Sequence, residues 1–314
     1  MTNTTPANKA EPSALAIEAR AVSKHFGALR AVDGVDLSIA RGEIFGLIGH
    51  NGAGKSTLFK MMLGLIAPSS GQITVNGVAV QGADFRTARR AIGYLPENVV
   101  LYDNLSGLET LRFFARLKGA PLAQCQPTLE RVGLAHAGPR PVREYSKGMR
   151  QRLGFAQALL GNPQVLFLDE PTNGLDPQAI RDFYATLRGL SQQGVTIVIT
   201  SHILAELQER VGRLGIMASG KLQAVGTVHA LREQMNLALT VTAELTPQGL
   251  VAAQQKVLRL PGVTCTSAPG GLRVQCPRER KIEVLAALSS LGSEVRDLQV
   301  QEASLEDVFL GFAD

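Results

Sequence analysis

The sequence has no tryptophan and only 4 tyrosines among its 314 residues. Single-stranded nucleic acid is usually bound by stacking its bases on aromatic side chains, so a surface of that kind is not expected here. The formal net charge of +5 is small for this length and favours neither a nucleic-acid partner nor an anionic membrane surface. We therefore expect no nucleic-acid partner.

Cysteine is also scarce, since the chain has only Cys125, Cys265 and Cys276, without a C-x-x-C pair. This scattered, odd-numbered set argues against a disulfide framework or a zinc site and favours reduced, buried thiols. No apolar run reaches the roughly 18 residues that a membrane span needs. Residues 1–14 lack a basic region followed by an apolar core, so we expect a disordered tail and no signal peptide.

The chain does have enough apolar material for a sizeable core, with 45% hydrophobic and 19% charged residues. Its length favours one large and one small domain. Because the composition changes after about Leu231, we place the large domain at residues 15–231 and the small one at 237–314.

Hydrophobic periodicity in the large domain predicts an α/β fold. Strands are expected over 15–26 and, with a turn at Arg41–Gly42, twice within 30–49. The elements expected after them are a helix over 56–66, a hairpin over 71–80, a mostly helical region over 86–160, buried strands over 165–170 and 195–200, and a hairpin over 214–226.

The small domain shows a βαββαβ order, which predicts a ferredoxin-like α+β unit. The expected elements are a strand over 238–245, a helix over 247–260, a hairpin over 262–276, a helix over 278–291 and a strand over 294–301. Residues 304–312 begin with a capping-box pattern, from Ser304 to Asp307, and predict a short terminal helix.

A glycine-rich loop follows the apolar run 44–48 and matches G-x-x-x-x-G-K-[ST]. Glycines let backbone N–H groups turn inward around a phosphate, and the N-terminus of the following helix favours the same anion. Lys55 is then expected along the β- and γ-phosphates, and the Ser56 hydroxyl on Mg²⁺. An incidental glycine turn is the alternative. The expected nucleotide-binding residues are Gly49, His50, Asn51, Gly52, Ala53, Gly54, Lys55, Ser56 and Thr57.

Two acidic residues and a histidine follow the two buried strands, whose carboxyl ends should meet at one edge of a parallel sheet. Asp169 would hold Mg²⁺ and Glu170 would polarise the attacking water. His202 would contact the γ-phosphate and steady the water. A solvated acidic pair and a surface histidine are the alternatives, and the neighbouring glycine loop makes them less favoured.

Further motifs flank the acidic pair in a fixed order. A signature-like stretch, Ser146, Lys147, Gly148, Met149 and Arg150, precedes it, and Asp176 follows within 174–177. With these motifs, roughly residues 15–230 closely resemble an ATP-binding-cassette (ABC) ATPase. The resemblance implies a P-loop NTPase fold, with a mixed sheet core, an antiparallel β subdomain and a helical subdomain, that hydrolyses ATP with Mg²⁺.

The resemblance also implies that one chain supplies only half of each nucleotide site. Ser146 and Gly148, with Asp176 nearby, would complete the site of a second copy in a head-to-tail homodimer. Phe26 takes the place of the aromatic that stacks on adenine, although a core phenylalanine is the alternative.

Three positions depart from the family pattern. His50 stands where proline is usual, and Met149 replaces a glutamine in the signature. Glu97 replaces the glutamine of the Q-loop, which in this family contacts Mg²⁺ and senses the membrane partner. A carboxylate there would bind the metal more strongly but would add negative charge beside the γ-phosphate.

Four stretches, 49–55, 93–99, 109–120 and 145–161, closely resemble the ATPase subunits of transporters that mature nitrous oxide reductase. Such subunits act with a separate six-span permease and a periplasmic accessory protein, and the system supplies copper or sulfur for the copper centres of the reductase. The resemblance implies a cytoplasmic subunit, peripheral on the inner face of the bacterial plasma membrane. We expect no copper site within this chain, because its cysteines and histidines are scattered.

Three alternatives stay open. An exporter ATPase for a drug, lipid or polysaccharide shares the ending at 304–312, so that ending does not discriminate. A cassette protein acting on ribosomes or DNA is disfavoured, because the chain has one phosphate loop and no heptad run. A regulatory binder that does not hydrolyse ATP is disfavoured by the presence of Glu170 and His202.

Overall fold

The computed structural model describes residues 14–201, 207, 208, 210–235, 237–302, 304, 306 and 307. The tail predicted at residues 1–14 thus lies, except for Ala14, outside the described residues. The chain forms two compact units that divide between Val225 and Gly226. Helix α8 (Val228–Gln234) therefore groups with the second unit, whereas the sequence placed the boundary after Leu231.

An antiparallel four-stranded sheet opens the first unit, in the order β2-β1-β4-β5. Its strands are β1 (Leu15–Phe26), β2 (Leu29–Ala40), β4 (Ser70–Val75) and β5 (Val78–Ala79). The predicted hairpin turn is confirmed, since Asn76 and Gly77 have φ angles of 52° and 79°. Positive φ at both central residues is what the tight turns of β-hairpins require.

A second sheet of six strands has the order β10-β9-β3-β8-β7-β6. Strands β9, β3, β8, β7 and β6 pair in parallel, and those in the middle are buried along almost their whole length. The bounds are β3 (Ile44–Gly49), β6 (Ile92–Leu95), β7 (Val165–Asp169), β8 (Thr196–Thr200), β9 (Arg213–Ala218) and β10 (Lys221–Gly226). The predicted buried parallel strands are confirmed.

Strand β6 was not predicted, because residues 86–160 were expected to be mostly helical. The strand has only 4 residues, and so short an apolar run cannot be told from part of a buried helix by periodicity. Gly93 allows it to approach its neighbours closely, since a Cβ at that position would lie 2.2 Å from the carbonyl oxygen of Ala158. This strand carries the segment that contains Glu97 to the edge of the sheet.

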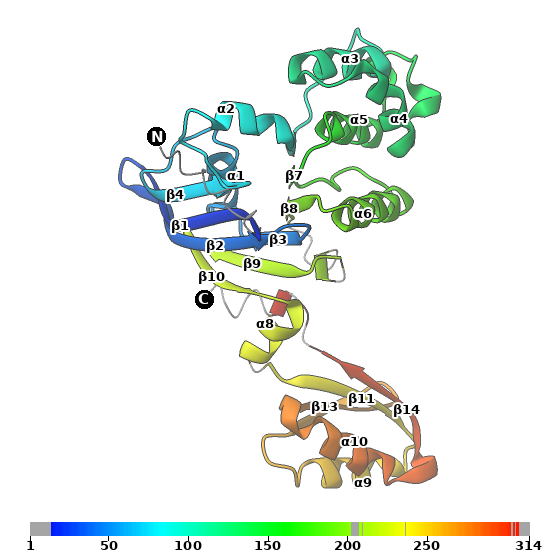
Figure 1. Ribbon diagram of the computed structural model, residues 1–314. Helices are drawn as coiled ribbons and strands as arrows, with labels where there is room; N and C mark the ends of the chain where they lie inside the picture. The colour runs from blue at the N-terminus through cyan, green and yellow to red at the C-terminus, as the bar shows by residue number, and fades with distance from the viewer. Residues whose placement is uncertain are drawn as a thin grey trace, which may run out of the picture. The chain divides into compact units, whose positions relative to one another are not determined.

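The helices of the first unit include a group, α3, α4 and α5, drawn apart from the antiparallel sheet in Figure 1. This group corresponds to the predicted helical subdomain. The bounds are α1 (Lys55–Met62), α2 (Phe85–Ala88), α3 (Gly107–Lys118), α4 (Cys125–Arg131), α5 (Lys147–Leu159) and α6 (Pro177–Gln192). Helix α1 ends earlier than predicted, where Gly64 takes a φ of 63°.

The core of the first unit joins both sheets to helix α1. Phe59 of α1 packs edge-to-face on Phe167 of β7, with ring centroids 5.4 Å apart, and both are buried. This contact fixes the helix that follows the glycine loop against the strand that carries Asp169.

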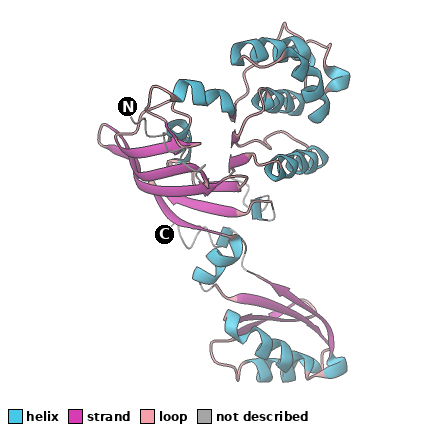
Figure 2. Ribbon diagram, viewed as in Figure 1, coloured by secondary structure: helices cyan, strands magenta, loops and turns pink. Residues whose placement is uncertain are grey.

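The second unit contains a βαββαβ fold with the antiparallel sheet order β12-β13-β11-β14, as predicted (Figure 2). One face of β11 is buried against helices α9 and α10. The bounds are β11 (Leu239–Leu245), α9 (Gly249–Val257), β12 (Thr264–Ala268), β13 (Gly271–Cys276), α10 (Lys281–Ser289) and β14 (Val295–Gln301).

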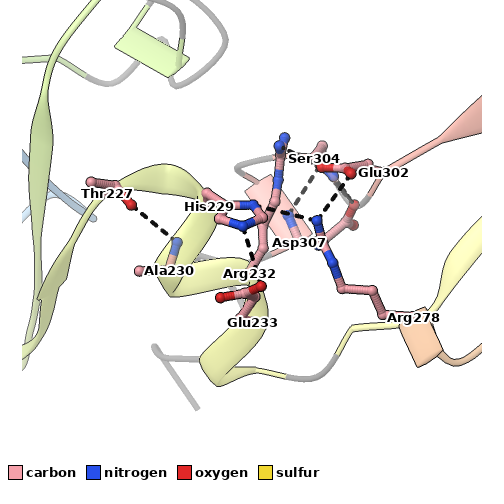
Figure 3. A network of polar contacts seen from close by, with 9 residues as sticks. All are labelled: Thr227, His229, Ala230, Arg232, Glu233, Arg278, Glu302, Ser304 and Asp307. Carbon is pink, nitrogen blue, oxygen red and sulfur yellow. Dashed lines mark hydrogen bonds and ion pairs between the residues drawn. The ribbon is translucent and has the colours of Figure 1, made fainter.

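Ion pairs centred on Glu302 hold α8 within this unit (Figure 3). The Glu302 carboxylate accepts hydrogen bonds from Arg232 of α8 and from Arg278, both at 3.2 Å. The predicted capping box is present, because the Asp307 amide donates to the Ser304 hydroxyl at 3.1 Å and the Asp307 carboxylate accepts from the Ser304 amide at 2.8 Å. Most of the helix predicted over 304–312 lies outside the described residues.

None of the helices in the described part of the chain has the length and apolar character that crossing a lipid bilayer requires. All three cysteines are free thiols, with Cys125 and Cys276 buried and Cys265 half-buried.

Candidate nucleotide site

The glycine loop connects buried strand β3 to helix α1 and needs its glycines. Gly54 caps the helix with a φ of 102°, a region that side chains with a Cβ rarely adopt. A Cβ on Gly54 would lie 2.3 Å from the carbonyl oxygen of Ala31, and one on Gly49 would lie 2.5 Å from that of Met217. The backbone thus forms a concave loop at a helix N-terminus, which is suited to a phosphate.

Lys55 extends back across this loop. Its ammonium donates to the carbonyl oxygens of Gly49 at 2.6 Å and His50 at 3.0 Å. Burial lowers the pKa of Lys55, while the carboxylates of Glu170, Asp169 and Glu97 act to raise it. Those three acidic side chains therefore lie close enough to interact with the amine, as a shared MgATP site requires.

A cavity of about 560 Å³ opens over the loop. Besides residues 50–57 it is lined by Phe26 and Leu29, at the turn between β1 and β2, and by Ser219 and Gly220 between β9 and β10. The Phe26 ring is 51% exposed, with the Lys24 ammonium 5.2 Å from its centroid. An exposed ring at one end of the cavity and a phosphate loop at the other fit a nucleotide with a flat base.

Asp169 and Glu170 lie at the carboxyl end of β7. The Thr200 hydroxyl, at the end of neighbouring β8, donates to the Asp169 carboxylate, and the Glu170 amide donates to the Thr200 carbonyl at 3.2 Å. Glu170 has a φ of 46°, an uncommon and strained value for a residue with a side chain. Sequence reasoning missed Thr200, although a hydroxyl ending a buried strand beside Asp169 was a usable signal.

Glu97 follows β6 and lies near the same edge. Burial raises the pKa of the Tyr94 hydroxyl, and the negative charges of Asp169 and Glu97 raise it further. Within the described residues, no three His, Cys, Asp or Glu side chains are grouped so that they could hold a metal ion. Ser56, Asp169 and Glu97, the residues predicted to hold Mg²⁺, would bind it together with phosphate oxygens and water, as Mg²⁺ commonly requires.

His202 lies outside the described residues, so its predicted contact with the γ-phosphate stays a prediction. Strand β8 ends at Thr200, two residues before His202, at the same edge of the sheet as Asp169.

The signature stretch begins helix α5 in the helical group. Ser146 caps the helix, accepting a hydrogen bond from the Met149 amide at 3.2 Å. Gly148 approaches the segment after Glu170 so closely that a Cβ there would lie 2.8 Å from the carbonyl oxygen of Gly174. Asp176 caps α6, accepting from the Ala179 amide at 2.8 Å.

Ser146, Gly148 and Asp176 are absent from the described lining of the phosphate-loop cavity; Asp169 and Glu170 are absent too, but these two carboxylates interact with the Lys55 amine. The predicted site residues thus fall into two sets within one chain. One set surrounds the phosphate loop and Lys55, and the other begins helices α5 and α6.

Comparisons with known proteins agree with this geometry. The ABC transporter family profile matches residues 32–173. The chain is 35% identical to the daunorubicin resistance ATP-binding protein DrrA3 of Streptomyces coeruleorubidus, covering 94% of this chain and 95% of that protein. It is also 36% identical to ATP-binding cassette sub-family A member 7 of Mus musculus over 90% of this chain, but it spans only 14% of that longer protein.

Among solved structures, the ATP-binding subunit of an ABC transporter superposes with a TM-score of 0.65 at 33% identity, covering 69% of this chain and 92% of that one. The similarity to DrrA3 extends along nearly the whole of both chains, which makes it a family relationship rather than a shared fold alone. The chain belongs to the ABC transporter family, and its first unit is an ABC ATPase domain that uses ATP with Mg²⁺.

Proposed function

We propose that this chain is the ATP-hydrolysing subunit of a transporter, that it works as a head-to-tail homodimer and that it drives a separate membrane permease. The observation that carries the proposal is the separation of the two sets of site residues. Ser146 and Gly148 start helix α5 and do not line the Lys55 cavity, whereas Asp169, Glu170 and Glu97 interact with the Lys55 amine. A second copy in head-to-tail orientation supplies the missing half of each site.

Within one site, the roles follow from position. Lys55 and the loop amides hold the β- and γ-phosphates, and Phe26 stacks on the base. Mg²⁺, held by Ser56, Asp169 and Glu97, would neutralise the phosphate oxygens. Glu170, placed by the Thr200 backbone, orients and polarises the attacking water.

We infer from the sequence that His202, which lies outside the described residues, would contact the γ-phosphate. Its side chain would then keep the water and the Glu170 carboxylate in register. Replacing His202 with alanine should slow hydrolysis without abolishing ATP binding, and loss of binding instead would contradict this role.

The test of the dimer uses Glu170→Gln, which should bind ATP, dimerise and barely hydrolyse it. In that background, Asn51→Cys in the loop and Lys147→Cys beside the signature should crosslink between two copies when ATP is added. Both positions are exposed, and two of the three native cysteines are buried, so the unsubstituted Glu170→Gln chain is the control. Crosslinking that ATP leaves unchanged would refute the dimer.

A surface near Glu97 supports a membrane partner. A cavity of about 500 Å³ lies between the segment after β6 and helices α3 and α5. Val100 and Leu117 line it and are 86% and 70% exposed, so two large apolar side chains of one cavity are available to a partner. Pro96 and Asn98, on both sides of Glu97, line the same cavity, so a permease bound there would act directly on that residue.

If the permease binds this apolar surface, introducing one negative charge there should prevent its binding. Val100→Asp should prevent co-purification with the permease while leaving ATP binding intact. Leu65→Asp, at another apolar residue that is 55% exposed, is the control and should leave both co-purification and ATP binding intact. The chain would then occupy the cytoplasmic side of the bacterial plasma membrane as a peripheral subunit.

Two cargo classes have specific support. The motif stretches within 49–55, 93–99, 109–120 and 145–161 favour maturation of the copper site of nitrous oxide reductase, with copper or sulfur carried by the permease and a periplasmic accessory protein. The end-to-end similarity to a daunorubicin resistance protein favours drug export. Deleting the gene separates them: loss of the copper centres of the reductase supports the first, and drug sensitivity with an intact reductase supports the second.

A further inference from the structure

A second cavity, of about 230 Å³, lies among helices α4, α5 and α6, which Figure 1 shows grouped in the first unit. It is separate from the nucleotide cavity, since the two share no lining residue. Its floor is formed by Val132, Phe155 and Phe183, which are all buried. The phenyl rings lie 4.7 Å apart between centroids, at 60°, and offer an apolar wall that suits a flat hydrophobic group.

A half-buried arginine, Arg152, also lines this cavity. The Arg152 Nε atom is buried and has no hydrogen-bond partner among the residues that the structure describes. Another guanidinium nitrogen lies 3.3 Å from where a Cβ on Gly133 would be, so this glycine leaves room for the arginine beside the cavity. Buried donors are usually paired, because an unpaired donor loses its hydration without compensation.

The carboxylates at the rim do not pair with Arg152. Asp182 accepts a hydrogen bond from the Gln178 side chain at 2.9 Å, and Glu130 accepts one from the Gln126 side chain at 3.4 Å. Neither forms an ion pair with Arg152 within the described structure. Because Nε is fully buried while Arg152 as a whole is half-buried, the outer guanidinium nitrogens are left for an acceptor that enters the cavity.

We propose that this cavity binds a small aromatic carboxylate, with the carboxylate on the Arg152 guanidinium and the ring against Phe155 and Phe183. Glu130, Arg131 and Asp182 also line the cavity, and an apolar wall with a few convergent polar groups is the usual form of a small-molecule site. The volume limits the ligand to about the size of benzoate, for which a dissociation constant on the order of 1 mM is expected.

The site is also placed to regulate ATP hydrolysis, an effect that rests on the proposed function, whereas ligand binding does not. Helix α5 starts at the signature serine, and α6 starts at Asp176, whose carboxylate accepts from the amide of Ala179, itself a lining residue. A ligand between these helices stabilises the present spacing of both caps. It therefore opposes their movement toward a second copy and lowers the hydrolysis rate.

Binding is tested by ligand-observed NMR titration of the full chain with benzoate, with acetate and with benzyl alcohol. Benzoate should bind at least about tenfold more tightly than either, because only benzoate offers both the ring and the carboxylate. Ala179→Leu fills the cavity and should weaken benzoate binding at least about tenfold. Ala185→Leu, exposed on the same helix, is the control and should bind benzoate normally.

Arg152→Lys keeps the positive charge but removes the planar guanidinium that can hold a carboxylate through two parallel hydrogen bonds, and it should also weaken benzoate binding. Equal binding of benzyl alcohol and benzoate, or no binding of benzoate, would overturn the proposal and leave water as the partner of Arg152. If benzoate binds, saturating amounts should slow hydrolysis in the wild type at least about twofold but leave Ala179→Leu unaffected. Binding without any change in rate would overturn the regulatory effect, and a chain that binds benzoate but never hydrolyses ATP would contradict the proposed function instead.

Discussion

Thr200→Val isolates one contact at the centre of the nucleotide site. The Thr200 side chain is 1% exposed at the end of β8, and its hydroxyl donates to the Asp169 carboxylate. The same hydroxyl accepts from the Glu170 amide at 3.1 Å. Valine keeps the branched shape that a buried strand favours and removes only these two contacts.

The expected losses of stability and of hydrolysis rate follow from the hydrogen bonds that Thr200→Val removes and those that it leaves in place. A hydrogen bond to a charged group contributes about 1.5–3 kcal/mol, so the free energy of unfolding should fall by that amount. The Glu170 amide retains the Thr200 carbonyl oxygen at 3.2 Å, so no buried backbone donor is stranded. Losing the group that orients a metal-binding carboxylate typically costs about 10–100-fold in activity, which we expect in the ATP hydrolysis rate.

Thr196→Val provides the matched control, at the opposite end of the same strand. Thr196 is also 1% exposed, and its hydroxyl accepts from the Gly42 amide at 3.0 Å, away from the nucleotide. It should lower stability by about 1–2 kcal/mol and leave hydrolysis unchanged. The assays are urea unfolding and ATP hydrolysis at several Mg²⁺ concentrations. Equal slowing of hydrolysis in both variants would refute the assigned role of Thr200.

Further predictions concern Lys118, which lines the cavity near Glu97, the glycine loop, and the stacking of Phe26 on the nucleotide base. Burial lowers the pKa of Lys118 from 10.5 to about 8, so the unfolded chain holds its proton more tightly and stability rises between those pH values. Urea unfolding should therefore show that Lys118→Met stabilises the chain by about 1–2 kcal/mol at pH 7 and by less as the pH rises to 10.5. Arg116→Met, in the same helical turn, is the control and should not show this pH-dependent stabilisation. Gly54→Ala should lower the ATP affinity measured by calorimetry at least about 100-fold, because φ is 102° there and alanine would distort the loop, although the chain still folds. Near-normal affinity would contradict the phosphate-binding role of the glycine loop. Phe26→Ala should weaken ATP binding about 2–10-fold and Phe26→Tyr should not, and equal effects would remove the stacking role.

The sequence predicted the elements that have a strong local period. The parallel strands ending at Asp169 and Thr200 and the whole βαββαβ order of the second unit follow from apolar runs and turn residues that tertiary contacts do not override. The glycine spacing likewise predicted the phosphate loop, and the structure shows close approach at Gly54, where a Cβ would lie 2.3 Å from the carbonyl oxygen of Ala31.

What the sequence did not reveal depends on partners far along the chain. Strand β6 exists because Ile92–Leu95 pair with β7, more than seventy residues later, and its own period is too short to show this. The role of Thr200 depends on its contact with Asp169, and that of Arg152 depends on the cavity that it lines beside Phe183. No local sequence pattern predicts either contact.

The most direct test of the composite site mixes two inactive chains, Lys55→Ala and Ser146→Arg. Each alone should lack hydrolysis, because both of its sites carry a defect. In a mixed dimer, the intact Lys55 of one chain faces the intact Ser146 of the other, so random mixing should restore up to about a quarter of the wild-type rate. Mixtures that stay as inactive as the separate chains, although the two variants are shown to dimerise with each other, would contradict the account.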